Sequence, residues 1–341
     1  MLCRNNGRLS LIMRSILLVL LISGGFFSLL SCEPMQKQSG PREKLTIAYS
    51  TASNAVLVYI AFAKGYFWEE GLDAIPQPHP FGKPALTAVI EGKADIATVG
   101  DTPIVFAVMN GEKIMTLAAI QTSNKDEAIV ARRDRGITKP ADLKGKKIGV
   151  PFGTTAHFFI DSFLLAHGLV MEKVTLVDMK PAEMAVALEN GRVDAVSVFN
   201  PTVKQLEKHL GENGVLFYSE SLYKTFCVTA TQEFVKKNPE AIKKFLRALI
   251  KSETFIKEHP KEAQNLVADF IKMDKTELAD IWNILTFRVT LDQALLVDFE
   301  DQTRWILKNR LSNATRMPNY LEYIHTDGLD AVKPIAVRIV R

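Results

Sequence analysis

The chain has 341 residues, of which 47% are hydrophobic and 23% are charged, and this is an ordinary globular composition that is long enough for two domains. Its formal net charge is +4, but Arg4, Arg8 and Arg14 lie in the leader described next. Without the leader the chain is close to neutral, so its charge gives no support to a nucleic-acid-binding role.

The first residues have the pattern of a secretory leader. A basic segment precedes an apolar run over residues 16–30, which is too short for a membrane span of about 20 apolar residues. Leu29-Leu30-Ser31-Cys32 resembles the bacterial lipoprotein box. We therefore expect a lipoprotein signal peptide at 1–31, a lipid anchor at Cys32 and a tether at 32–44. This places the protein in the periplasm or on the outer face of the cytoplasmic membrane.

The rest of the chain is organised around a repeated pattern. Gly92-Lys93-Ala94-Asp95 and Gly191-Arg192-Val193-Asp194 lie 99 positions apart, and each follows a helical run and precedes a short apolar strand. A glycine suited to a helix C-terminus followed by a strand is typical of the second half of an αβ unit. The repeat therefore predicts two similar α/β lobes.

In chain order, strands and helices alternate, which predicts doubly wound and largely parallel sheets. We expect strands at 45–50, 96–100, 114–120, 127–132, 147–151, 174–177, 193–199 and 215–218. Helices are expected at 54–64, 85–91, 103–110, 155–167, 181–190 and 201–210. From residue 231 the pattern is mainly helical, with an extended segment at 285–291. Lobe 1 is assigned to 45–133 and 229–341, and lobe 2 to 134–228. The chain crosses between them near 132–136 and 224–230.

Polar residues gather where the strands end, which is where open α/β sheets bind ligands. The candidate ligand-binding residues are Ser53, Asn54, Gly100, Asp101, Thr102, Thr122, Ser123, Gly153, Thr154, Thr155, His157, Asn200 and Thr225. The six histidines are scattered, and the metal-binding, nucleophile-elbow and phosphate-loop motifs are missing. We therefore predict no catalytic residue, no metal and no cofactor. With Cys32 lipidated, Cys227 has no partner, so no disulfide is expected.

The segment Gly153-Thr154-Thr155-Ala156-His157 is the strongest of these candidates. Its glycine permits close backbone approach, and the helix that follows presents free N–H groups, which bind anions. The alternative is that Thr154 or Thr155 only caps the helix.

Four ordered blocks resemble the nitrate/sulfonate/taurine-type solute-binding proteins of bacterial ABC importers. They are residues 63–72, 91–100, 141–150, and 191–195 together with Asn200-Pro201, within a likeness that covers roughly 45–310. The resemblance implies a type II periplasmic-binding-protein fold with two doubly wound α/β lobes, a hinge and a helical C-terminal tail. In that family the strand-end residues match cleft positions. Many relatives carry Trp and an acid where this chain has Phe199-Asn200, so the identity of the ligand does not transfer.

The resulting hypothesis is the extracytoplasmic substrate-binding component of an ABC importer, which binds a small organic anion and delivers it to permease and ATPase partners. His157 would add a donor or a charge, and Phe152, Phe199 and Phe226 would line an apolar side unless they only pack in the core. One alternative is a pyrimidine or thiamine-precursor ligand held by Asp101. The others are an enzyme or a sensor of the same fold.

Overall fold

The computed structural model describes residues 41–169 and 173–340. The predicted signal peptide, the anchor at Cys32 and nearly all of the tether lie outside the described residues. Within them, no helix has the length and apolar character needed to cross a membrane.

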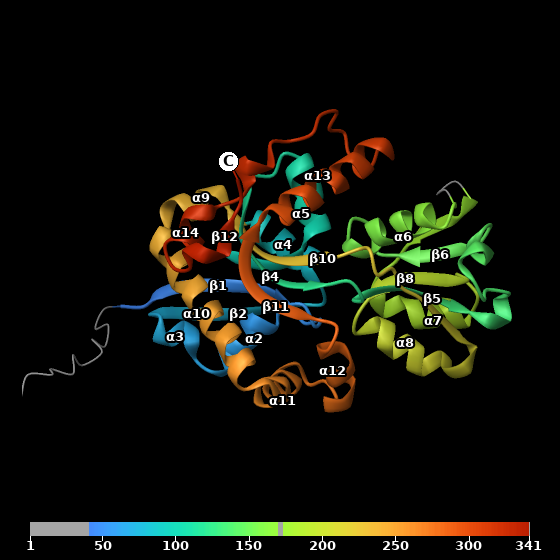
Figure 1. The fold of residues 1–341 in the computed structure, drawn as a ribbon, viewed down its shortest axis with the longest axis horizontal. Coiled ribbons are helices and arrows are strands. Elements are labelled where there is room, and N and C mark those ends of the chain that lie inside the picture. The colour runs from blue at the N-terminus through green and yellow to red at the C-terminus, as the bar shows by residue number, and fades with distance from the viewer. Residues whose placement is uncertain (1–40, 170–172, 341) are drawn as a thin grey trace, which may run out of the picture. The chain divides into compact units, whose positions relative to one another are not determined.

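The described chain contains a seven-stranded sheet in the order β12-β11-β4-β10-β3-β1-β2 (Figure 1). β1 is parallel to β2 and to β3, whereas β10 is antiparallel to both of its neighbours. The strands are β1 (Glu43–Ser50), β2 (Leu72–His79), β3 (Ile96–Gly100), β4 (Ile114–Ser123), β10 (Lys224–Thr231), β11 (Thr286–Asp292) and β12 (Val337–Arg338).

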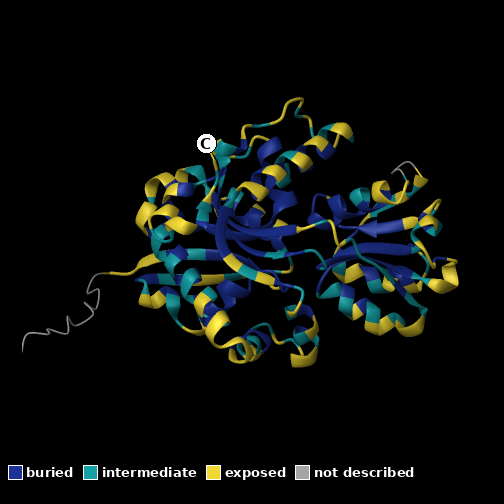
Figure 2. Cartoon of the chain, in the orientation of Figure 1, coloured by how far each residue is buried: buried dark blue, intermediate teal, exposed yellow. Residues whose placement is uncertain are grey.

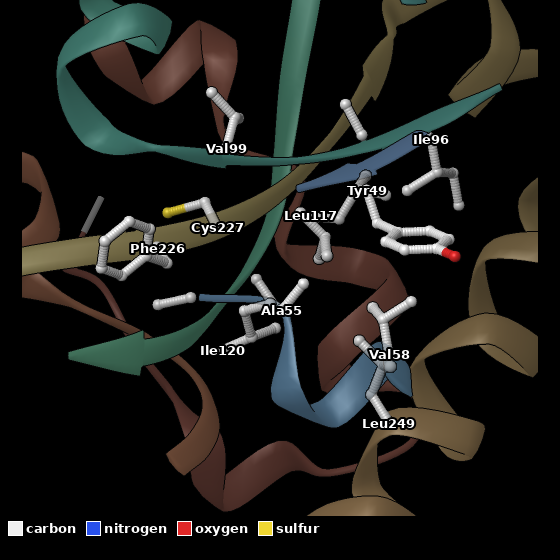
Figure 3. Packing of buried hydrophobic residues seen from close by; sticks show 14 of the residues in the cluster. Tyr49, Ala55, Val58, Ile96, Val99, Leu117, Ile120, Phe226, Cys227 and Leu249 are labelled. Carbon is white, nitrogen blue, oxygen red and sulfur yellow. The ribbon is translucent and has the colours of Figure 1, made fainter. Parts of the chain in front are cut away.

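Helices cover this sheet, and their apolar faces form one core with its strands. They are α2 (Val56–Ala63), α3 (Tyr66–Glu69), α4 (Gly82–Ile90), α5 (Asp101–Met109), α9 (Gln232–Lys237), α10 (Pro239–Glu258), α11 (Pro260–Ile271), α12 (Lys275–Trp282), α13 (Gln293–Lys308) and α14 (Thr326–Asp330). Figure 3 shows Val58 of α2 and Leu249 of α10 among the packed side chains, close to Tyr49 of β1. Phe67 of α3 is buried and stacks on Phe245 with ring centroids 5.6 Å apart.

The second sheet has five strands in the order β7-β6-β8-β5-β9. These strands are β5 (Glu127–Arg132), β6 (Lys147–Val150), β7 (Thr175–Asp178), β8 (Ala195–Phe199) and β9 (Gly214–Phe217). Two separate clusters of buried apolar residues pack on it, one with α6 (Thr155–Ala166) and one with α7 (Met184–Glu189) and α8 (Thr202–Leu210). Figure 2 shows the inner strands β5, β6 and β8 mostly dark blue, between helices whose outer faces are yellow.

Short 3₁₀ turns occupy several of the connections. They are η1 (Arg133–Arg135), η2 (Pro140–Leu143), η4 (Pro181–Glu183), η5 (Gly211–Asn213), η6 (Tyr320–Tyr323) and η7 (Pro334–Ala336).

The repeated Gly-x-x-Asp pattern has the same structural role in both sheets. Gly92 and Gly191 both adopt the left-handed conformation, with φ of 70° and 73°, as a helix C-terminus requires. Asp95 Oδ2 accepts a hydrogen bond from Thr46 N at 2.7 Å, and Asp194 Oδ2 accepts one from Lys147 N at 2.9 Å. Each aspartate therefore joins the start of one strand to that of the neighbouring parallel strand. The two copies of the repeat therefore play the same structural role, one in each sheet.

The sheets differ from the sequence analysis in three respects. First, both sheets are mixed rather than largely parallel. In the first sheet β10 and β4 run antiparallel to both of their neighbours, and in the second sheet β5 does. Second, β2 was missed, since its prolines Pro76 and Pro78 argue against a strand except at a sheet edge, where it lies. Third, the helical tail also adds β12 to the first sheet.

The chain also changes sheets earlier than the sequence suggested. It leaves the first sheet after Ser123 and joins the second at Glu127, and it returns between Phe217 and Lys224. The strand at 127–132, assigned to lobe 1, is thus part of the second sheet, and residues 224–228, assigned to lobe 2, begin β10. The outward connection is the short segment 124–126, not the predicted crossing near 132–136.

Candidate functional site

Loops from both sheets meet at a small cavity of about 20 Å³. Four of the predicted residues line it, namely Asn54 at the start of α2, Gly100 at the end of β3, and Thr154 and Thr155 at the start of α6. The other lining residues are Phe81, Gly82, Lys83, Pro103, Phe199 and Phe226. The cavity therefore combines short polar groups and one lysine with three aromatic rings.

The two sides of this cavity are in direct contact. Lys83 Nζ, on α4, donates a hydrogen bond to the carbonyl oxygen of Phe152 at 2.8 Å. A Cβ placed on Gly100 would lie only 2.7 Å from Thr155 Cγ2. Sites that hold organic ligands have volumes of roughly 300–1,000 Å³, so in this structure the cavity is too small to hold such a ligand.

The start of α6 is open to an acceptor. The alternative that Thr154 caps this helix is wrong, because its hydroxyl donates to Pro151 O at 2.7 Å and no side chain caps the helix. The start of α2 likewise has no side-chain cap. Because the first N–H groups of a helix carry partial positive charge and have no partner within the helix, these termini favour an anion.

His157 supports the loop that precedes α6. Its Nδ1 accepts a hydrogen bond from Gly153 N at 3.2 Å, and its ring stacks on Phe152 with centroids 4.6 Å apart. Trp305 of α13 lies edge-on to the same ring at 5.0 Å. Burial lowers the pKa of His157 to about 4, so the imidazole is neutral near pH 7 and adds no charge there.

Both carboxylate oxygens of Asp101 accept hydrogen bonds from backbone N–H groups. Its Oδ1 accepts from Thr102 N at 2.7 Å and its Oδ2 from Thr225 N at 3.0 Å, so it joins the start of α5 to β10. The Thr102 hydroxyl also bonds to Asp101, and both residues are fully buried. This arrangement leaves the carboxylate with little capacity for the ring N–H groups of a pyrimidine.

The remaining predicted residues fall into two groups. Ser53 Oγ and Asn200 Oδ1 are buried with no hydrogen-bond partner among the described residues, so they have capacity for a ligand or water. Thr122 and Thr225 form a cross-strand pair, and Ser123 Oγ donates to Ile284 O, which places these three beside the sheet crossings rather than on the cavity.

Sequence reasoning missed a group of buried charges next to the crossings. Lys224 is nearly fully buried, and its Nζ lies 4.2 Å from the centroid of the Phe158 ring. Burial raises the pKa of Glu127, and it raises that of Asp298 to about 7. In a linear sequence these residues look like ordinary polar strand ends or the exposed face of a helix. Nothing in the sequence around Lys83 or Trp305 marks either residue as part of the site.

No group of histidine, cysteine or acidic residues in the described part of the chain could hold a metal ion. Cys227 is a buried free thiol on β10, and burial raises its pKa well above the ordinary value. A buried, protonated thiol is a poor nucleophile.

Residues 52–263 match the family described as NMT1/THI5 like, and the chain belongs to this family. Relatives of this chain include proteins named for the binding of aliphatic sulfonates and of taurine. A Bacillus subtilis protein, whose name assigns it to aliphatic sulfonates, is 27% identical over 73% of this chain and 79% of its own length. The taurine-binding periplasmic protein of Escherichia coli is 28% identical over 61% of this chain and 65% of its own length.

Solved structures confirm the expected fold. The alkanesulfonate-binding protein of Xanthomonas axonopodis pv. citri bound to MOPS matches with a TM-score of 0.73, at 18% identity, over 84% of this chain and 99% of its own. The fold is not confined to binding proteins, because a desulfurization enzyme matches with a TM-score of 0.61, at 17% identity, over 86% of this chain and 99% of its own.

Proposed function

We propose that this protein is the extracytoplasmic substrate-binding component of an ABC importer, and that it binds a small sulfonate-type organic anion between its two lobes. The observation that carries the proposal is the uncapped start of α6, which faces Gly100 across a cavity lined by Lys83 and three phenylalanines. The family membership and the names of the relatives support the same class of ligand.

The chemistry of the cavity suits an anion with an apolar portion. Each helix N-terminus favours negative charge by about 0.3–1 kcal/mol, and Lys83 is the only charged residue among the lining residues. Phe81, Phe199 and Phe226 offer apolar surface on the other side. A sulfonate oxygen can accept hydrogen bonds from the helix N–H groups while its carbon substituent lies against the rings.

We further propose that the two connections between the sheets, at 124–126 and 218–223, act as the hinge. Opening there would separate Gly100 from Thr155 and admit the ligand, and closing would bury it. In this proposal the lipid anchor at Cys32 would hold the protein outside the cytoplasmic membrane, and the closed form would deliver the anion to the permease.

Two alternatives are less well supported. A pyrimidine-like ligand needs a free acceptor, and both Asp101 oxygens already accept backbone N–H groups. An enzyme of the same fold needs a nucleophile or an acid–base pair at the site, and the lining residues offer only threonine hydroxyls and Lys83. A sensor would use the same cavity and differ only in its partner.

Calorimetric titration of the mature protein with alkanesulfonates, taurine, nitrate and pyrimidines tests the proposal. We expect a sulfonate to bind, and Lys83→Met to weaken binding several-fold and reduce its salt dependence. The matched control, Lys236→Met on exposed α9, should leave binding unchanged. Binding of a pyrimidine, with no response to any sulfonate, would replace the proposed ligand class.

A further inference from the structure

Glu127 lies where the chain enters the second sheet, and groups from both lobes surround it. It is the first residue of β5, directly after the connection at 124–126, and only 2% of it is exposed. Within the second lobe, its carboxyl accepts a hydrogen bond from the Thr155 hydroxyl. From the first lobe, the charges of Lys224 and Asp101 act on it. Separation of the two lobes at the proposed hinge would therefore change the surroundings of this carboxyl.

The neighbours of Glu127 leave its charge without a direct partner. Its Oε1 and the Nζ of Lys224 are both buried, and neither has a hydrogen-bond partner among the described residues. Lys224 lies over the ring of Phe158, on α6 of the second lobe, at 4.2 Å from the ring centroid. A buried charge that lacks a direct partner is unfavourable, so an ionised Glu127 opposes this arrangement of the lobes.

Two other carboxyl groups lie near these residues, but each is surrounded by groups of one lobe. Asp126, the residue before Glu127, is buried, and the groups that act on it are Glu127 and Asn200 of the second lobe. The charges that act on Asp298 all belong to the first lobe, and they are those of Asp101, Lys224, Asp292 and Asp301. Of the three carboxyls, Glu127 is the one with close neighbours in both lobes.

We propose that Glu127 makes closure of the lobes proton-linked, because its carboxyl takes up a proton from solvent when the lobes close on the anion and releases it when they open. In the structure described here, burial raises the pKa of Glu127 above its ordinary value of 4.5. Opening would admit water and return the pKa towards that value. Protonation also removes a negative charge beside Thr155, which lines the small cavity. This inference rests on the proposed function and adds a control of ligand release to it.

The direction of the pH effect follows from the two pKa values of this carboxyl. The form with the lobes together has the higher pKa, so it holds the proton in a pH range where the open form has lost it. Closure is therefore most favourable below about pH 5 and weakens as the pH rises through the raised pKa. We expect the affinity for an anion to fall about tenfold or more between about pH 5 and pH 8.

Calorimetry of the intact mature protein with ethanesulfonate, at pH values from about 5 to 8, tests this inference. The sulfonate group stays ionised over this range, so the ligand itself adds no titration. Titrations at one pH in two buffers with different ionisation enthalpies give the number of protons exchanged on binding. At about pH 6 we expect the wild type to take up a large fraction of one proton.

Glu127→Gln keeps the shape of the side chain and cannot ionise. At every pH it should bind ethanesulfonate about as tightly as the wild type does at about pH 5, without proton uptake. Asp298→Asn is the matched control, since burial raises the pKa of Asp298 too, but only first-lobe charges act on it. This variant should retain the full pH dependence of binding. Thermal melts establish that both variants are folded.

The outcomes separate this inference from the proposed function. If ethanesulfonate binds with the same affinity over the whole pH range and without proton uptake, the inference is overturned and the proposed function stands. A pH dependence that persists in folded Glu127→Gln, or that disappears in Asp298→Asn, would also overturn it. If no alkanesulfonate binds at any of these pH values, the proposed function fails, and the inference fails with it.

Discussion

Gly100 and Thr155 belong to different sheets and approach so closely that a Cβ on Gly100 would lie 2.7 Å from Thr155 Cγ2. Gly100 has an ordinary extended backbone, with φ of −71° and ψ of 163°, so the conformation itself does not require glycine. Glycine is required at this position because no space is left for a Cβ beside Thr155 Cγ2. In the proposed hinge motion, this contact is lost when the lobes open.

Gly100→Ala should therefore oppose closure without destabilising either lobe. We expect sulfonate affinity to fall about tenfold or more, because overpacking of this kind costs typically 1–3 kcal/mol. Calorimetry measures the affinity, and thermal unfolding without ligand should remain close to that of the wild type.

The double variant Gly100→Ala/Thr155→Ser provides the control. Serine keeps the hydroxyl and removes Cγ2, the atom that the new methyl group would meet. Affinity should recover in large part. If the double variant binds as weakly as Gly100→Ala, the steric explanation is wrong.

Trp305 should be important for stability although it lies in the C-terminal helical region. It contacts Phe106 at 5.8 Å, His157 at 5.0 Å and Phe158 at 5.2 Å between ring centroids, and it is buried. Trp305→Ala should lower the free energy of unfolding by about 3–5 kcal/mol, measured in urea. Trp68→Ala, at a residue that is 57% exposed, should cost below about 1 kcal/mol. Equal losses in the two variants would contradict this account of Trp305.

The half-buried carboxyl of Asp298 predicts a specific pH dependence of stability. Burial, with added repulsion from Asp101, raises the pKa of Asp298 from 3.8 to about 7 in the folded protein. In the unfolded chain this carboxyl has its ordinary pKa of 3.8. Its favourable contribution to the free energy of unfolding is therefore complete below about pH 4 and is lost as the pH rises towards 7. Asp298→Asn does not ionise, so it should gain stability relative to the wild type across this window, by roughly 1–3 kcal/mol at pH 8.

Urea unfolding of both proteins at pH 5 and pH 8 measures this difference. Asp301→Asn, three residues along the same helix and exposed, is the matched control and should show a much smaller change between the two pH values. An advantage of Asp298→Asn that is equal at both pH values would show that the aspartate does not titrate as described.

The sequence predicted the features that depend on local patterns. The Gly-x-x-Asp repeat predicted two similar lobes, and both aspartates bridge neighbouring parallel strands. Thr154, Thr155, Gly100 and Asn54 were placed at the strand ends, and all four line the cavity. These features are recognisable because a glycine C-terminus, a strand and a polar tip follow one another within about ten residues.

Features that depend on tertiary contacts were not predictable in the same way. Trp305 meets His157 only because α13 lies beside α5 and against the start of α6. Lys224 and Glu127 are far apart in sequence and become neighbouring buried charges only where the chain crosses between the sheets. The polar residues Gln77 and His79 lie between prolines in a segment with no clear strand pattern, so β2 was not expected.

Small-angle X-ray scattering of the mature protein, with and without saturating hexanesulfonate, tests the central claim that the two lobes close on an anion. The account predicts a larger radius of gyration without ligand than with it. Gly100→Ala should show a smaller decrease at the same ligand concentration. Scattering curves that are identical with and without a sulfonate shown by calorimetry to bind would contradict closure of the lobes on the ligand.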